Sequence, residues 1–140
     1  MQVECKRRFD ADCGMKYIVI ALGGGIGSVL RYTLGGWVQT WSGSAAFPWG
    51  TLAVNLLGCF IIGLVSQLAE GRGGFSAETR LFLVVGLLGG FTTFSAFGNE
   101  TLNLLRDGEH AYAVLNAAGN LLIGLAAVWL GRAAAFALWR

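Results

Sequence analysis

Three long stretches without a charged residue constrain this chain more than any other feature. Residues 32–69, 81–99 and 111–131 contain no Asp, Glu, Lys or Arg. A helix rises about 1.5 Å per residue, so each stretch is long enough to cross the ~30 Å hydrocarbon core of a bilayer. Only 13% of all residues are charged, whereas about 25% is usual in soluble domains. The chain is therefore predicted to be an integral membrane protein.

Four membrane-spanning helices follow from the apolar segments. They are expected over about residues 17–38, 49–69, 81–105 and 111–139. Backbone groups in lipid must bond within the chain, and the segments lack the short length and two-residue alternation of barrel strands. The predicted fold class is therefore an all-α integral membrane protein with four transmembrane helices.

The first residues differ in composition from the rest. Six of residues 1–14 are charged, and no apolar period runs through them. We interpret residues 1–14 as a non-native or disordered N-terminal extension, and residues 15–140 as a single four-helix domain. The apolar segment after Lys16 continues into the first span without a cleavage site, so it is expected to be a retained helix and not a secretory signal.

Several common functions are excluded by composition. The net charge is +2, and no basic cluster alternates with aromatic residues, which argues against nucleic-acid binding. The three cysteines, Cys5, Cys13 and Cys59, do not have metal-site spacing. The glycine-rich segment Gly23–Arg31 lacks the third glycine and the following acidic residue of a dinucleotide site. No set of catalytic residues is present, so the chain is not expected to be an enzyme.

The third span contains a segment that predicts a break near the middle of its helix. Gly89 and Gly90 each weaken a helix by about 1 kcal/mol relative to alanine. Three hydroxyl side chains follow directly: Thr92, Thr93 and Ser95. A break at membrane depth is tolerated where the freed backbone is buried in protein or lines a cavity, and there freed carbonyls can coordinate a cation and freed amides can contact an anion. The segment therefore indicates a site.

Uncharged polar side chains form stripes on two other spans. Thr51 and Asn55 are four residues apart in the second span, as are Asn116 and Asn120 in the fourth, so each pair shares a helix face. An unpaired amide in hydrocarbon costs roughly 2 kcal/mol or more. Two interpretations stay open: hydrogen bonds between helices, or donors that face a pathway for a small anion.

Four other side chains also have two interpretations each. Phe94 and Phe97 share a helix face and either pack normally or turn their electropositive edges toward an anion. Arg31 either extends to the membrane interface or lines an aqueous vestibule that attracts anions. Glu100 is either interfacial or a titratable group near the pathway.

Three motifs, in this order and with this spacing, resemble the Fluc (CrcB) family of fluoride channels over about residues 15–139. They are GGGIGSVLR at 23–31, GTLAVNLLGCFIIG at 50–63 and GLLGGFTTFSAFGNE at 86–100. The resemblance implies an antiparallel homodimer of dual topology in the bacterial plasma (inner) membrane. It also implies two narrow pathways and passive export of fluoride from the cytoplasm.

The resemblance further implies roles for single residues. Phe94 and Phe97 are similar to the family's pore phenylalanines, and Asn55 is similar to its pore asparagine. The backbone carbonyls of Gly89 and Thr92 are similar to those that hold a structural sodium ion at the dimer interface. Arg31 and Glu100 are similar to vestibule residues, and we place Thr51 with them. The predicted pore is completed by Thr93, Ser95, Asn116 and Asn120.

Two other functions compete with the fluoride channel. A small multidrug-type exporter needs an acid embedded in the membrane, usually in its first helix, but the first span carries only Arg31. Gly23 and Gly27 are expected to form a small-residue face through which helices approach closely, and a non-transporting membrane assembly protein would be held together by such glycine faces. That alternative leaves the asparagine stripes and the hydroxyls of the third span without a role.

Overall fold

The computed structural model describes residues 2–71 and 74–139, with side chains from residue 14 onward, and every element in these ranges is a helix. By length and composition, four helices are able to cross a membrane: Gly14–Ser42, Trp49–Glu70, Ala77–Arg106 and His110–Leu138. The all-helical, four-span prediction is confirmed. Residue 1 lies outside the described residues and residues 2–13 are described only as backbone, so the separate N-terminal extension stays a prediction.

The first and second spans are continuous helices, whereas the third and fourth are composite. The first two spans are α1 (Gln2–Ser42) and α2 (Trp49–Glu70). The third comprises α3 (Ala77–Arg80), the π-helical segment η1 (Leu81–Leu88), α4 (Gly89–Phe91) and α5 (Phe94–Arg106). The fourth comprises α6 (His110–Ala118), the π-helical segment η2 (Gly119–Ile123) and α7 (Gly124–Leu138). π-Helical turns inside α-helices often lie at functional sites.

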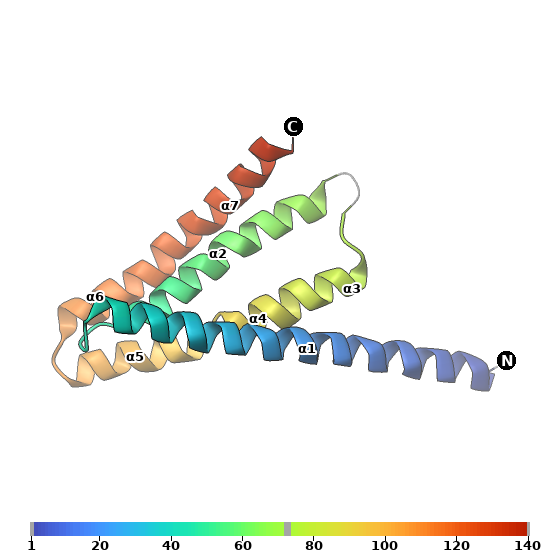
Figure 1. Ribbon diagram of the computed structural model, residues 1–140, viewed down its shortest axis with the longest axis horizontal. Helices are drawn as coiled ribbons and strands as arrows, with labels where there is room; N and C mark the ends of the chain where they lie inside the picture. Colours follow the sequence, from blue (N-terminus) through green and yellow to red (C-terminus); the bar gives the residue numbers. More distant parts are fainter. Residues whose placement is uncertain (1, 72–73, 140) are drawn as a thin grey trace.

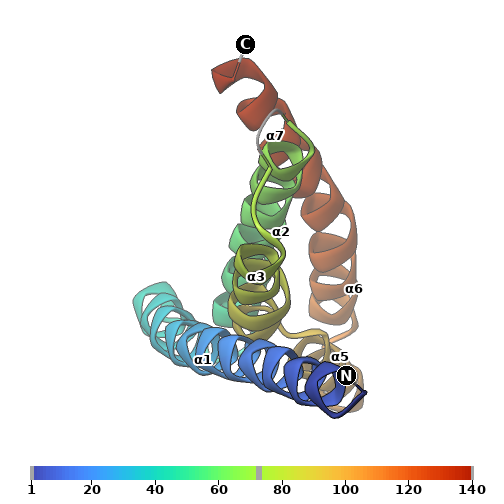
Figure 2. The ribbon, with the colours of Figure 1, turned by 90° about the vertical axis from the view of Figure 1, so that its right-hand side faces the viewer.

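The helices pack in pairs. In Figure 1, α2 and α7 lie side by side and rise away from the long helix α1, and the turned view in Figure 2 shows the same pairing. The first half of the third span follows α1, while α5 and α6 form a hairpin at the far end of the molecule from the N-terminus. The pair of α2 and α7 diverges from α1 and the first half of the third span, starting near the junction of α4 and α5 (Figure 1).

Glycines allow the backbones of paired helices to meet. A Cβ atom on Gly23 would lie 2.7 Å from the Phe82 carbonyl oxygen, and one on Gly27 would collide with the Leu87 carbonyl. Close helix approach through small residues is the usual packing mode in lipid, where apolar side chains gain little by leaving the membrane. The predicted glycine face of the first span is therefore confirmed.

In the third span, two extended residues separate α4 from α5. Thr92 has φ −87° and ψ 156°, and Thr93 has φ −148° and ψ 109°. Gly89 and Gly90, on which the sequence prediction rested, remain helical in α4. Thr93 starts α5 as its N-cap, because its Oγ1 accepts the Ala96 N–H at 3.2 Å. Residues 94–106 therefore form a new helix with its own N-terminus.

The turn from the third to the fourth span depends on a left-handed glycine. Gly108 has φ 79°. Its N–H donates to the Leu105 carbonyl at 3.2 Å, and the Glu109 N–H donates to the Leu104 carbonyl at 2.8 Å. This is the Schellman arrangement, which ends a helix and reverses the chain. It places the fourth span beside α5.

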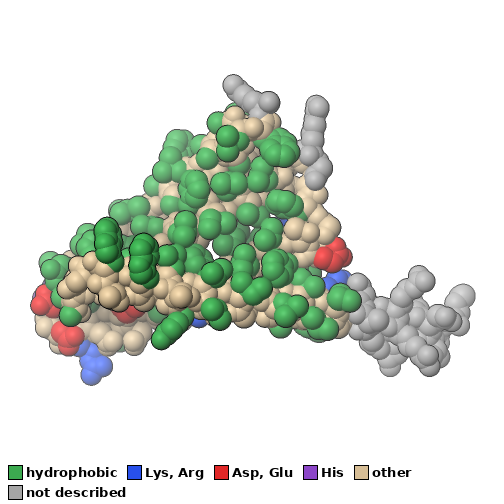
Figure 3. All heavy atoms as spheres, in the orientation of Figure 1, with side chains coloured by type: hydrophobic (Ala, Val, Ile, Leu, Met, Phe, Trp, Pro, Cys, Tyr) green, Lys and Arg blue, Asp and Glu red, His purple; other side chains and the backbone are tan. Residues whose placement is uncertain are grey.

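Many large apolar side chains lie on the outer surface of the described residues. Figure 3 shows hydrophobic side chains over most of one face, with acidic and basic side chains near its ends. Leu138 is 80% exposed and Tyr32 is 85% exposed, whereas Val54 in the interior is 1% exposed. An exposed apolar surface of this extent fits contact with lipid or with another protein chain.

Candidate functional site

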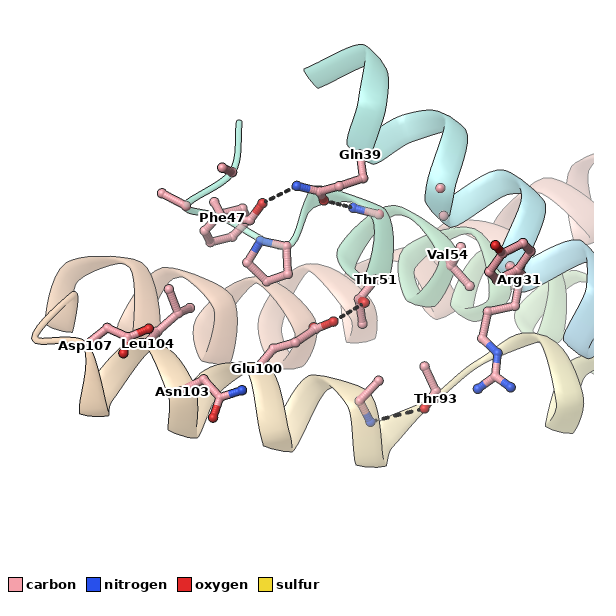
Figure 4. A pocket seen from close by; sticks show the side chains of 18 of the residues that line it. Arg31, Gln39, Phe47, Thr51, Val54, Thr93, Glu100, Asn103, Leu104 and Asp107 are labelled. Carbon is pink, nitrogen blue, oxygen red and sulfur yellow. Dashed lines mark hydrogen bonds between the residues drawn. The ribbon is translucent and has the colours of Figure 1, made fainter. Parts of the chain in front are cut away.

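A pocket of about 710 Å³ opens between α1, α2 and α5. Arg31 from the first span, Thr51 from the second and Glu100 from the third all line it (Figure 4). Thr93, at the start of α5, lies in the same wall, and Figure 4 shows the Arg31 guanidinium extending toward it. The structure therefore brings together the three residues that the sequence assigned to a vestibule.

Glu100 has one bonded and one unbonded carboxylate oxygen in this pocket. The Thr51 hydroxyl donates to Glu100 Oε1 at 2.6 Å. Glu100 Oε2 is buried and has no hydrogen-bond partner among the described residues. Buried polar atoms are bonded in nearly all folded proteins, so this oxygen is expected to bond a group other than the described residues.

Asn55 bonds both backbone groups of Thr93. The Thr93 N–H donates to Asn55 Oδ1 at 2.9 Å, and Asn55 Nδ2 donates to the Thr93 carbonyl at 3.2 Å. In a continuous α-helix the Thr93 N–H would donate to the Gly89 carbonyl four residues earlier. Asn55 takes the place of that carbonyl, which stabilises the extended residues and releases the Gly89 oxygen from its helical donor.

The asparagine stripes of the second and fourth spans meet. Asn55 Nδ2 donates to Asn120 Oδ1 at 2.8 Å, and Asn120 Nδ2 donates to Asn116 Oδ1 and to the Asn116 carbonyl, each at 3.0 Å. Asn116 is 0% exposed. Hydrogen bonds between spans, one of the two interpretations left open by the sequence, therefore account for these amides in the single chain.

The aromatic and hydroxyl residues after the extended segment lie at the surface of the chain. Phe94 is 83% exposed, and its ring meets the Phe97 ring edge-on with centroids 5.3 Å apart. Ser95 is exposed, and its Oγ lies 3.3 Å from Thr93 Oγ1. The Thr92 hydroxyl donates to the Leu88 carbonyl at 3.0 Å. The Phe94 ring and the Ser95 hydroxyl are thus exposed together on a face that this chain leaves uncovered, whereas Thr92, Thr93 and Phe97 are half-buried.

Sequence reasoning missed two polar residues that the structure connects to this region. Thr101 Oγ1 accepts from Asn116 Nδ2 at 2.9 Å and donates to the Phe97 carbonyl at 2.8 Å. Gln39 Nε2 donates to the Phe47 carbonyl at 3.0 Å, and its Oε1 accepts the Gly50 N–H at 3.0 Å (Figure 4). The four-residue spacing of Phe97 and Thr101 was a visible signal for the first of them.

Comparison with known proteins identifies the family. A family model described as "CrcB-like protein, Camphor Resistance (CrcB)" matches residues 18–132. A Thermus thermophilus protein named "Fluoride-specific ion channel FluC" is 55% identical over 116 residues, which cover 83% of this chain and 90% of that protein. Proteins with the same name from Opitutus terrae and Rhizobium johnstonii are 52% identical over 124 residues and 48% identical over 121 residues. They cover 87% and 86% of this chain, and 93% and 96% of their own lengths. Because these matches extend into all four spans, the chain belongs to the CrcB family.

Proposed function

We propose that this protein is a fluoride-selective ion channel through which fluoride leaves the cytoplasm passively. The observation that carries the proposal is the group of neutral donors and ring edges at the extended residues Thr92 and Thr93, in a chain about half identical to proteins named fluoride-specific ion channels. Fluoride is small and strongly hydrated, so several close donors must replace its water, and a narrow bore then disfavours larger anions.

The pathway runs from the vestibule to the phenylalanines. Arg31 raises the local concentration of anions in the pocket that Thr51 and Glu100 also line. The ring edges of Phe94 and Phe97 then contact the ion. Such a contact is weak enough to release the ion, whereas a buried cation would hold it. In this proposal Thr93 and Ser95 supply the remaining hydroxyls of the pathway wall, and Asn55, Asn120 and buried Asn116 are the amides that are bonded directly behind it.

Two chains complete each pathway in this proposal. They form an antiparallel homodimer of dual topology in the bacterial inner membrane, with two pathways per dimer. The 83% exposure of Phe94 supports this assembly, because a ring that contacts an ion inside a membrane must be enclosed by further protein. The partner chain supplies that enclosure and a second set of ring edges.

A structural sodium ion at the centre of the dimer fits the backbone at the extended residues. The Thr93 N–H donates to Asn55, so the Gly89 carbonyl lacks its usual helical donor. Unwound carbonyls of this kind are sodium ligands in membrane proteins. The Gly89 and Thr92 carbonyls of both chains would hold the ion, and its charge would make the nearby pathway favourable for anions.

Fluoride efflux from liposomes tests the proposal. Purified protein is reconstituted into vesicles loaded with either fluoride or chloride, and a potassium ionophore clamps the potential. Fluoride release without chloride release is expected. Fluoride release no faster than from protein-free vesicles would overturn the proposal.

The ring-edge contact has its own test. Phe94→Ile and Phe97→Ile keep an apolar side chain but remove the electropositive ring edge, so both variants are expected to slow efflux while the dimer persists. Size-exclusion chromatography of each variant separates slow efflux from failed assembly. Unchanged efflux in both variants would remove the phenylalanines from the pathway.

A further inference from the structure

A directed chain of hydrogen bonds joins the extended residues to the middle of α5. The Thr93 N–H donates to Asn55 and Asn55 donates to Asn120, so the chain begins at the extended segment and reaches the fourth span. From there Asn120 donates to Asn116, Asn116 to Thr101, and Thr101 to the Phe97 carbonyl. This series of hydrogen bonds links three spans and ends on a residue of the proposed pathway.

The N–H donors of Asn55 and Asn120 in this hydrogen-bond series are all used by neighbouring groups. A side-chain amide has two N–H donors. Those of Asn55 go to the Thr93 carbonyl and to Asn120, and both bonds that Asn120 donates end on Asn116. Because each bond fixes the donor and acceptor sense of the next, a change at one end alters the bonds available along the chain.

Thr101 is the residue of α5 whose side chain takes part in this hydrogen-bond series. Its hydroxyl accepts from buried Asn116 and donates to the Phe97 carbonyl, and a hydroxyl performs both roles at once. We propose that Thr101 is a positioning residue of the fluoride pathway, which couples the fourth span to the turn of α5 that carries Phe97. The inference rests on the proposed function and adds to it a residue that need not touch the ion.

A matched control is present on the first span. Thr40 makes the same bond to its own helix, since its hydroxyl donates to the Gly36 carbonyl at 2.8 Å on an exposed face of α1. Within residues 14–71 and 74–139, no amide from a second span is found on the Thr40 hydroxyl. Removing this hydroxyl therefore tests the loss of a bond within one helix, without the coupling between spans.

Valine has nearly the shape of threonine but lacks the hydroxyl, so Thr101→Val isolates the hydrogen bonds. A buried donor left without its acceptor is expensive, and fluoride efflux of the Thr101→Val dimer is expected to slow about tenfold. Thr101→Ser keeps the hydroxyl, and together with Thr40→Val it should stay within about twofold of the parent protein. Efflux at the parental rate in Thr101→Val, or equal slowing in Thr101→Ser, would overturn the inference.

A second measurement does not depend on transport. With 4-fluorophenylalanine at position 97, the ¹⁹F resonance of the detergent-solubilised protein reports the surroundings of that ring. Thr101→Val is expected to shift or split this resonance, whereas Thr101→Ser and Thr40→Val should leave it unchanged. Should Thr101→Val not assemble, Thr101→Ala leaves room for a water to accept the Asn116 N–H, and the same shift and slowing are expected of it.

The two measurements separate the inference from the proposed function. If the parent protein passes no fluoride but the position-97 resonance responds to Thr101→Val, the channel proposal fails while the coupling to Phe97 stands. If the parent protein passes fluoride but neither efflux nor resonance responds to Thr101→Val, the positioning role alone fails.

Discussion

The two halves of the third span are held in different ways. The half before Thr92 lies on α1 through backbone contacts, as at Gly23 against Phe82. The half after Thr93 is held by directional side-chain bonds, among them Thr51 to Glu100 at 2.6 Å. Shape therefore fixes the first half, and hydrogen-bond donors and acceptors fix the second. Single polar substitutions should affect the second half selectively.

The largest expected effect belongs to the half fixed by shape. Gly27→Ala would drive a methyl group into the Leu87 carbonyl, and backbone cannot move aside as a flexible side chain does. We expect a loss of about 3 kcal/mol in the free energy of unfolding, at the upper end for an overpacked site. Denaturant titration in detergent measures it. Gly25→Ala, where no atom lies within 4 Å of the added Cβ among the described residues, is the control.

Asn55→Leu should have the next largest effect, in the half fixed by hydrogen bonds. It leaves the Thr93 N–H and the Asn120 Oδ1 atom without their Asn55 partners. An unsatisfied buried polar group costs about 2 kcal/mol, and the same titration should show a loss of that size. Asn103→Ala changes an exposed amide of α5 and should stay within about 0.5 kcal/mol. Equal losses in the two variants would contradict the stabilising role of the bonds from Asn55 to the Thr93 backbone.

Thr51→Val tests the bond that orients Glu100. Without the hydroxyl, Glu100 Oε1 loses its donor while Oε2 already lacks one in the described part of the chain. A hydrogen bond to a carboxylate contributes about 1.5 kcal/mol, so unfolding should become easier by that amount. Thr51→Ser should restore most of the loss. A serine variant no more stable than the valine variant would show that packing, and not the hydroxyl, matters at this position.

Local patterns explain why the spans were predictable and the details of the site were not. Charge-free segments and closely spaced glycines are visible in sequence, so the four spans and the face of Gly23 and Gly27 were predicted correctly. The extended residues lie at Thr92 and Thr93, beyond the predicted weak point at Gly89, because Asn55 from another span bonds the Thr93 backbone. A contact between residues 38 positions apart leaves no periodic signal.

Thr101 was missed for the same reason. Its spacing from Phe97 suggests only a bond within one helix, which threonine makes commonly in membrane spans. Its second partner, Asn116, comes from the fourth span and is fully buried. Only the packed arrangement of the third and fourth spans turns an ordinary threonine into a connection between them.

The smallest expected effect belongs to the ion pair between the last residue of α2 and the middle of α7. Arg132 Nη2 bonds Glu70 Oε2, but the two side chains are 38% and 60% exposed, so water and salt screen the pair. A double-mutant cycle of Arg132→Ala and Glu70→Ala should give a coupling of about 0.5 kcal/mol that shrinks as salt rises. The adjacent Gly131 faces the Phe60 carbonyl at backbone contact, and Gly131→Ala should cost several times more than the ion pair. A coupling above about 1 kcal/mol that persists in high salt would show that charge, and not close approach of backbones, holds these helices together.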